Sequence, residues 1–139
     1  MQRKKRNWAK PGYKPIPDET EQVGKQVLNA AFEVHKALGP GYVEKFYEEA
    51  LCIELAARNI QFVRQKSVEV YYREHLIGHH RLDLLVENQV IVELKSVERL
   101  LGVHEAQLIS YLHATGLRLG YLLNFNGVLL KEGIRRIAL

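Results

Sequence analysis

The stretch RLDLLVENQVIVELK, residues 81–95, decides the fold because it has the pattern of two core strands joined by a short polar turn. Three ionisable side chains interrupt its apolar pattern: Asp83 on the first strand, and Glu93 and Lys95 on the second. A charge buried alone costs on the order of several kcal/mol. Charged groups at these positions therefore indicate partners for one another or a bound metal ion.

The length of the turn determines whether these side chains meet. Strand side chains alternate between the two faces of a sheet, so Glu93 and Lys95 share one face, and Leu82 is expected on the same face as Leu84 and Val86. A three-residue loop over 87–89 would pair Val86 with Val90 and place Asp83 opposite Glu93, about 5 Å apart. A two-residue loop would send the two carboxylates to opposite faces. We therefore predict a loop of odd length or a bulge that restores the register.

Two carboxylates facing each other in this way could bind one divalent cation. Carboxylate oxygens suit Mg²⁺ or Mn²⁺, and a single cysteine argues against a structural zinc site. A lysine beside such a cation can orient a water molecule and stabilise negative charge developing on phosphorus. The pattern thus indicates a metal-dependent phosphodiester hydrolase. Because like charges cluster at such a site, we expect a mildly raised carboxyl pKa without metal. The alternative is a cross-strand salt bridge between Lys95 and Asp83 or Glu93.

The composition is that of an ordinary globular domain. The chain has 139 residues, of which 47% are hydrophobic and 26% charged, and this length favours a single domain. Cys52 is the only cysteine, so no intrachain disulfide can form, which fits a reducing compartment and predicts a cytoplasmic protein. The sequence shows neither a signal peptide's apolar run nor an apolar stretch of about 20 residues, so we expect no membrane association.

The net charge of +4 comes from the N-terminus. Residues 1–17 contain six basic residues and no acid, and removing these six from the chain's 20 leaves 14 against 16 acidic residues in 18–139, a net of −2. Residues 1–19 are therefore predicted to be a flexible basic leader and 20–139 the folded domain. The run formed by Arg3, Lys4, Lys5 and Arg6 is a candidate contact for nucleic-acid phosphates; the alternative is a solubilising leader.

The rest of the chain predicts an α/β fold. Periodicity indicates helices over about 20–38, 43–58 and 103–116, with Asp18 or Thr20 capping the first. Strands are expected at 62–72, 76–86, 90–95 and 119–125, with a short edge strand at 128–130. The order predicts a sandwich in which an antiparallel three-strand meander gains a further strand through a crossover helix.

Two helices add candidate site residues. On the second helix, Glu44 or Glu48 could supply a third carboxylate; the alternative is that these acids favour the helix dipole. On the later helix, His104, Gln107 and Tyr111 share one face near the strand end that carries Lys95, and Gln107 could position water or a phosphate. The alternative is that all three are ordinary helix positions. His79 and His80 point to opposite faces of one strand, and we interpret them as polar strand residues.

These motifs together resemble a known family. GYVEKFY at 41–47 fits the pattern G-x-x-E-x-x-Y and is followed by DLLV at 83–86, VELK at 92–95 and HEAQ at 104–107. From about residue 23 to 137 the chain resembles the GxxExxY protein family, which is grouped with the PD-(D/E)XK nuclease superfamily. One departure is that Leu82 stands where a proline precedes the aspartate of the name motif.

The resemblance implies a restriction-endonuclease-like core and a set of roles. By position, Asp83 and Glu93 would be metal ligands, Lys95 the catalytic lysine, and Glu44 the acidic residue of the first core helix. Gln107 and Tyr111 match a Q-x-x-x-Y element of exonuclease-like branches.

Three hypotheses for function follow. The first is a Mg²⁺-dependent nuclease, acting on DNA rather than RNA. The second is a non-catalytic nucleic-acid-binding or protein-interaction module on the same fold, which the acidic balance of residues 18–139 slightly favours. The third is a homodimeric scaffold.

Overall fold

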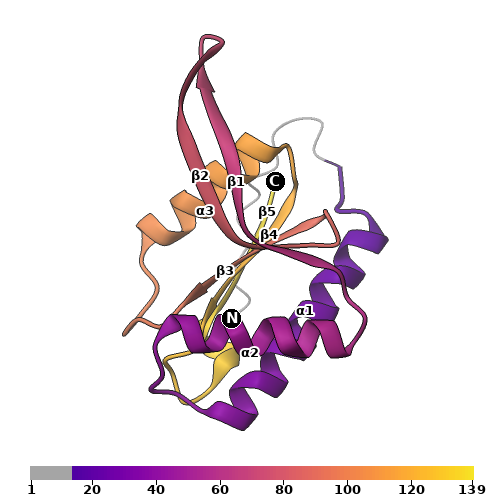
Figure 1. Ribbon diagram of the computed structural model, residues 1–139, viewed down its shortest axis with the longest axis vertical. Helices are drawn as coiled ribbons and strands as arrows, with labels where there is room; N and C mark the ends of the chain where they lie inside the picture. The colour runs from indigo at the N-terminus through magenta and orange to yellow at the C-terminus, as the bar shows by residue number, and fades with distance from the viewer. Residues whose placement is uncertain (1–13) are drawn as a thin grey trace, which may run out of the picture.

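The computed structural model describes residues 14–139, so the predicted contacts of Arg3, Lys4, Lys5 and Arg6 lie outside the described residues. The order of elements confirms the α/β prediction (Figure 1). The elements are α1 (Asp18–Leu38), α2 (Glu44–Ala57), β1 (Phe62–Tyr72), β2 (His75–Val86), β3 (Val90–Lys95), α3 (Gly102–Thr115), β4 (Leu119–Asn124), the 3-10 helix η1 (Leu130–Gly133) and β5 (Ile134–Ala138). None of the α-helices in this range is both long enough and apolar enough to cross a membrane.

The five strands form one mixed sheet in the order β1-β2-β3-β4-β5. β1, β2 and β3 are an antiparallel meander, β4 runs parallel to β3 after the crossover helix α3, and β5 returns antiparallel to β4. This is the mixed sheet flanked by helices that the restriction-endonuclease-like prediction requires.

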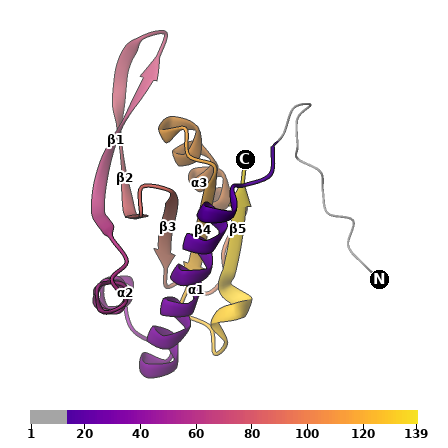
Figure 2. The ribbon, with the colours of Figure 1, turned by 90° about the vertical axis from the view of Figure 1, so that its right-hand side faces the viewer.

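Helices cover the sheet on both faces (Figure 2). α1 and α2 pack on one face over a core built from Val27, Ala30, Ala31, Tyr47, Leu51, Leu55, Leu84, Val86, Val90, Val92, Leu94, Leu123 and Phe125, among others. α3 packs on the other face, where the core contains Leu82, Leu85, Ile91, Leu108, Tyr111, Leu112 and Leu122. Nearly continuous burial of β3 and β4 follows from coverage on both sides, as expected for the centre of a sheet.

The turn between β2 and β3 has the predicted odd register. Val86 pairs with Val90 and Leu84 with Val92, so the three residues 87–89 form the loop. The prediction for Leu82 was wrong, because Leu82 packs in the α3 core whereas Leu84 packs in the α1/α2 core. The strict alternation of β2 is therefore broken at Asp83, and a local irregularity of the neighbouring strand, described below, lies at the same place.

Two local predictions at the ends of the fold were also wrong. No strand forms at 128–130; the chain first makes η1, and the returning edge strand is β5. Gly133 allows this path, since a Cβ there would lie 2.3 Å from the Asn124 carbonyl oxygen. At the other end, Pro17 occupies the N-cap position and neither Asp18 nor Thr20 caps α1. Asp18 is instead a first-turn acid that favours the helix dipole.

The far half of the β1–β2 hairpin extends away from the body of the protein (Figure 1). Arg73 and Glu74 form its tip with positive φ angles of 47° and 67°. Near the body, this hairpin leads directly into the part of β2 that carries Asp83.

Candidate active site

Asp83 and Glu93 lie together at the point where β2 and β3 part. The backbone N–H of Asp83 donates to Glu93 Oε2 over 2.7 Å, and the backbone N–H of Leu94 donates to Asp83 Oδ2 over 2.9 Å. Paired backbone positions in β2–β3 end at Leu84 and Val92, so beyond them the carboxylates accept hydrogen bonds from the strands. The two acids predicted to face each other therefore lie together where the pairing of β2 with β3 ends.

Burial sets the charge state of this pair. Glu93 is 4% exposed, and burial, followed by the negative charge of Asp83, raises its pKa to about 8. The hydrogen bond from the Asp83 N–H and the charge of Lys95 both lower the pKa of Glu93, but they do not cancel these effects. The pKa of Asp83 is also raised, chiefly by burial. The direction of these pKa shifts agrees with the mild rise expected from clustered acids, but the rise at Glu93 is larger and burial is its first cause.

The alternative of a cross-strand salt bridge is not what the structure shows. The ion pairs among residues 14–139 do not include one between Lys95 and either Asp83 or Glu93. The Lys95 charge still lowers the pKa values of Asp83, Glu93 and Glu44, so it acts on all three carboxyls. The lysine thus adds positive charge to the cluster without closing on one partner.

The residues of the G-x-x-E-x-x-Y motif fix the start of α2. Gly41 has a φ of 109°, a value that favours glycine, and turns the chain into the helix. The buried Tyr47 hydroxyl donates to the Gly39 carbonyl over 2.5 Å and accepts from the Tyr42 N–H over 3.2 Å. Its ring stacks on Phe125 with centroids 4.6 Å apart. The glycine and tyrosine of the motif are therefore structural, and they hold the first turn of α2, where Glu44 lies.

A further hydrogen bond ties this loop to β3. The Ser96 hydroxyl, next to Lys95, donates to the Tyr42 carbonyl over 2.8 Å. The start of α2 is thereby held near the end of β3. The pKa of Glu44 is raised overall. Partial burial of its carboxyl is the largest cause, the charge of Lys95 opposes the rise, and the charge of Asp83 adds to it. These effects place Glu44 within electrostatic reach of both predicted site residues.

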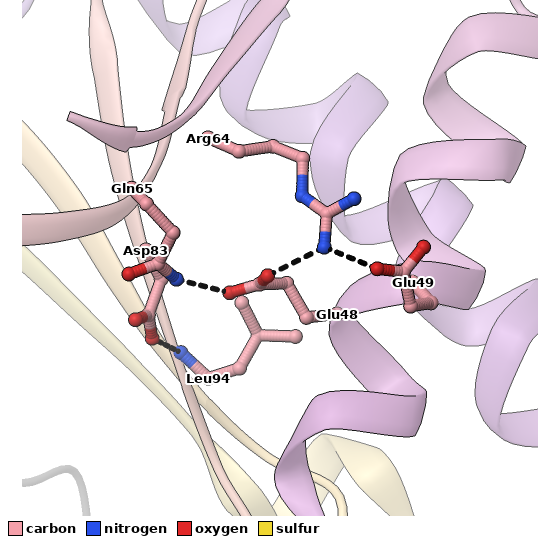
Figure 3. Close-up of polar contacts among 6 residues, drawn as sticks. All are labelled: Glu48, Glu49, Arg64, Gln65, Asp83 and Leu94. Carbon is pink, nitrogen blue, oxygen red and sulfur yellow. Dashed lines mark hydrogen bonds and ion pairs between the residues drawn. The ribbon is translucent and has the colours of Figure 1, made fainter.

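Glu48 is held by two residues of β1, as Figure 3 shows. Its Oε2 pairs with Arg64 over 2.7 Å, and its Oε1 accepts from Gln65 Nε2 over 2.6 Å. Arg64 also pairs with Glu49 over 2.6 Å. Both Glu48 oxygens are thus engaged by residues of β1. We infer that Glu44 rather than Glu48 is the better candidate for a third carboxylate.

Of the three site residues predicted on α3, only Tyr111 is placed near the acid pair. Tyr111 is 6% exposed, and burial, then Glu93 and Asp83, raises its pKa to about 12, so it lies close to the acid pair. Its ring meets the ring of His80 edge-on at 4.4 Å, a contact that the strand pattern did not reveal. His104 Nδ1 accepts from the Leu101 N–H over 2.9 Å and so caps α3. The Gln107 side chain is exposed and makes no hydrogen bond to residues 14–139, so its role in the site stays a prediction.

Sequence reasoning missed three contributors: Arg64, Gln65 and Ser96. Arg64 and Gln65 carried no signal because β1 was expected only as a strand of alternating character. Ser96 could have been noted as a polar residue directly after the VELK motif. Each acts by holding a neighbour of the acids, which a linear pattern does not reveal.

The chemistry of the acid pair fits a divalent cation. Mg²⁺ is commonly bound through one or two carboxylates with water and substrate phosphate as the other ligands. Asp83 and Glu93 are such oxygen donors. Their pKa values are raised chiefly by burial and further by the charge of neighbouring acids, and a cation would stabilise their ionised forms. Across residues 14–139, no three His, Cys, Asp or Glu side chains are placed to hold a metal ion together. The three-ligand set of Glu44, Asp83 and Glu93 therefore stays a prediction.

A comparison with protein-family models agrees with this geometry. The model described as the PD-(D/E)XK nuclease superfamily matches residues 21–137. The chain belongs to the PD-(D/E)XK nuclease superfamily. Proteins of this superfamily are generally nucleases, which supports a nuclease-type function with nucleic acid as the class of substrate. No curated protein and no solved structure matches the chain.

A substitution at Tyr47 tests the structural role of the motif. Tyr47→Phe is expected to lower the free energy of unfolding by about 1–3 kcal/mol, because the Tyr47 hydroxyl loses two part-buried hydrogen bonds, with the Gly39 carbonyl and the Tyr42 N–H. Urea denaturation monitored by circular dichroism measures the change. Tyr72→Phe is the control, since Tyr72 is 63% exposed and should change stability by less than about 0.5 kcal/mol. Equal midpoints for the two variants would contradict the assigned role.

Proposed function

We propose that this PD-(D/E)XK protein is a Mg²⁺-dependent nuclease of the GxxExxY type that hydrolyses DNA phosphodiester bonds. The observation that carries the proposal is the Asp83–Glu93 pair, in which each carboxylate accepts a backbone N–H at the parted end of two core strands. Lys95 follows on the same strand, and its charge acts on both acids. Few structural roles need a buried and a half-buried carboxylate to face each other.

Each residue has a defined task in this proposal. Asp83 and Glu93 would hold Mg²⁺ or Mn²⁺, with Glu44 as the third carboxylate. The bound cation would polarise the scissile phosphate and lower the pKa of an attacking water. The Lys95 ammonium stabilises negative charge as it develops on the phosphate oxygens. Gln107 positions the water or the phosphate from α3, while Tyr111 packs beside the acids.

Magnesium-dependent cleavage by the purified protein tests this function. Labelled single- and double-stranded DNA and RNA are incubated with protein and Mg²⁺, with EDTA as the blank. We expect DNA to be cut faster than RNA. Lys95→Ala is expected to lower the rate by roughly 100-fold or more, since it removes charge stabilisation in the transition state.

Lys131→Ala is the matched control, because this exposed lysine lies on η1. Cleavage that is equal in the wild type and in Lys95→Ala would identify a contaminating nuclease and overturn the proposal.

A second candidate is a module that binds nucleic acid without cutting it. The acidic balance of residues 18–139 favours it, because most DNA-binding surfaces are basic. Salt-dependent DNA binding without cleavage, lost when residues 1–17 are removed, would support this alternative. The homodimer, the cytoplasmic location and the division into 1–19 and 20–139 also stay predictions, and light scattering tests the first of them.

A further inference from the structure

Gln65 has a backbone conformation that an ordinary strand residue does not adopt. Its φ is +50°, in the left-handed region, although it lies inside β1. The residues on either side pair regularly with β2, Arg64 with Leu84 and Lys66 with Leu82. Gln65 itself stands opposite Asp83, and this position is missing from the ladder. A non-glycine residue has a steric cost in this region and persists there only when its surroundings hold it.

Packing does not explain this conformation. Gln65 is exposed and belongs to neither of the two cores. The conformation instead brings the side-chain amide to Glu48 and leaves Gln65 opposite Asp83. Gln65 Nε2 donates to Glu48 Oε1 over 2.6 Å (Figure 3). Hydrogen bonding by the same side chain also lowers the pKa of Asp83, as the smallest of the effects on that carboxyl.

The other contacts of these carboxylates complete a connected set. Arg64 pairs with Glu48 and Glu49, which balances charge on the α2 side. The Leu94 N–H binds Asp83 Oδ2 on the β3 side. An amide nitrogen has two hydrogens, so one glutamine can serve two acceptors from different elements. Gln65 is the link between the α2 acids and the β2–β3 acids.

We propose that Gln65 is a positioning residue of the candidate active site, and that its side-chain amide holds Asp83 in place against Glu48 of α2. This inference rests on the proposed function. The strained backbone is then the means by which β1 directs the amide toward the acids. Residues that hold metal ligands in this way typically change metal affinity 10- to 100-fold when they are replaced.

Two substitutions separate the effect of the side-chain amide from the effect of the strained backbone. Gln65→Met keeps the length of the side chain and the strained φ but removes the donor. Gln65→Gly removes the donor and relieves the strain, because glycine adopts positive φ without a steric penalty. Glu74→Gly is the matched control, since Glu74 also has a positive φ, of 67°, but lies at the far tip of the hairpin.

The first measurement is calorimetric titration of EDTA-stripped protein with Mn²⁺ alone. Gln65→Met and Gln65→Gly are both expected to bind Mn²⁺ at least about 10-fold more weakly than wild type, and Glu74→Gly with unchanged affinity. The second measurement is the thermal midpoint without metal. Gln65→Gly should unfold at a midpoint roughly 5 °C above that of Gln65→Met. A higher midpoint for Gln65→Gly than for Gln65→Met, with the same loss of Mn²⁺ affinity in both, would assign that loss to the amide.

Cleavage of DNA by the same variants separates this inference from the proposed function. If the wild type cleaves DNA and both Gln65 variants match it in Mn²⁺ affinity, the inference is overturned and the nuclease proposal stands. If the wild type binds Mn²⁺ without cleaving, and the Gln65 variants bind more weakly, the inference is supported and the nuclease proposal fails. A wild type that neither binds nor cleaves overturns both.

Discussion

Replacing Asp83 with asparagine is expected to lower Mg²⁺-dependent cleavage by roughly 1,000-fold or more while the fold is kept. The asparagine carbonyl can still accept the Leu94 N–H that Asp83 accepts now. What the variant loses is the negative charge that would hold the cation beside Glu93. A metal-dependent hydrolysis loses its main source of charge stabilisation when its cation is lost, so this substitution should have the largest effect on rate.

Cleavage kinetics and circular dichroism check this result together. Asp18→Asn is the control, because it removes an equal charge from the first turn of α1, away from the acid pair. Asp83→Asn should also lower the pKa of Glu93, since the charge of Asp83 contributes to raising it. A variant that retains cleavage within about tenfold of wild type would exclude Asp83 as a metal ligand.

The metal-free protein is expected to lose stability as the pH rises from about 4.5 to about 8. Glu93 has a pKa of about 8 in the folded protein, against an ordinary value of 4.5. Below pH 4.5 the carboxyl is protonated in both the folded and unfolded states, so it does not affect the balance. Between the two values the unfolded chain releases its proton while the folded protein keeps it, and the free energy of unfolding falls. The total fall is on the order of a few kcal/mol.

Thermal unfolding in EDTA at several pH values from 5 to 8.5 measures this trend. Glu93→Gln should flatten it, because the neutral amide can still accept the Asp83 N–H and has no proton to lose. Saturating Mg²⁺ should reverse it for the wild type, since a cation binds the ionised pair and stabilises the folded state. A midpoint that is independent of pH in EDTA would mean that Glu93 is ionised at neutral pH in the folded protein.

The sequence predicts the central part of this fold because turn length and side-chain alternation act locally. The loop over 87–89 determines the register of β2 and β3, and the register brings Asp83 opposite Glu93 without any knowledge of the rest of the chain. The position of Leu82 could not be predicted in this way. Its change of face accompanies the irregularity of β1 at Gln65, opposite the neighbouring Asp83, where β1 contacts α2 through Glu48.

The helix acids show the same limit. Glu44 and Glu48 lie one turn apart, and nothing in their spacing tells which of them is free to bind a metal ion. The distinction comes from Arg64 and Gln65, which engage Glu48 only when the whole α2–β1 arrangement has formed. The role of Tyr47 also depends on tertiary structure, because its partners lie in the loop at the end of α1.

The loop between β2 and β3 should tolerate changes in its length unusually poorly. Surface loops generally tolerate insertions and deletions better than the elements they connect. Here one added residue would shift β3 by a single position and turn Glu93 and Lys95 toward the opposite face of the sheet. The loop is also tied to its surroundings, since Glu87 bonds to Gln61 in both directions and Gln89 accepts from Thr20. Length variation at this solvent-facing turn should therefore be as harmful to the site as a substitution of the acids themselves.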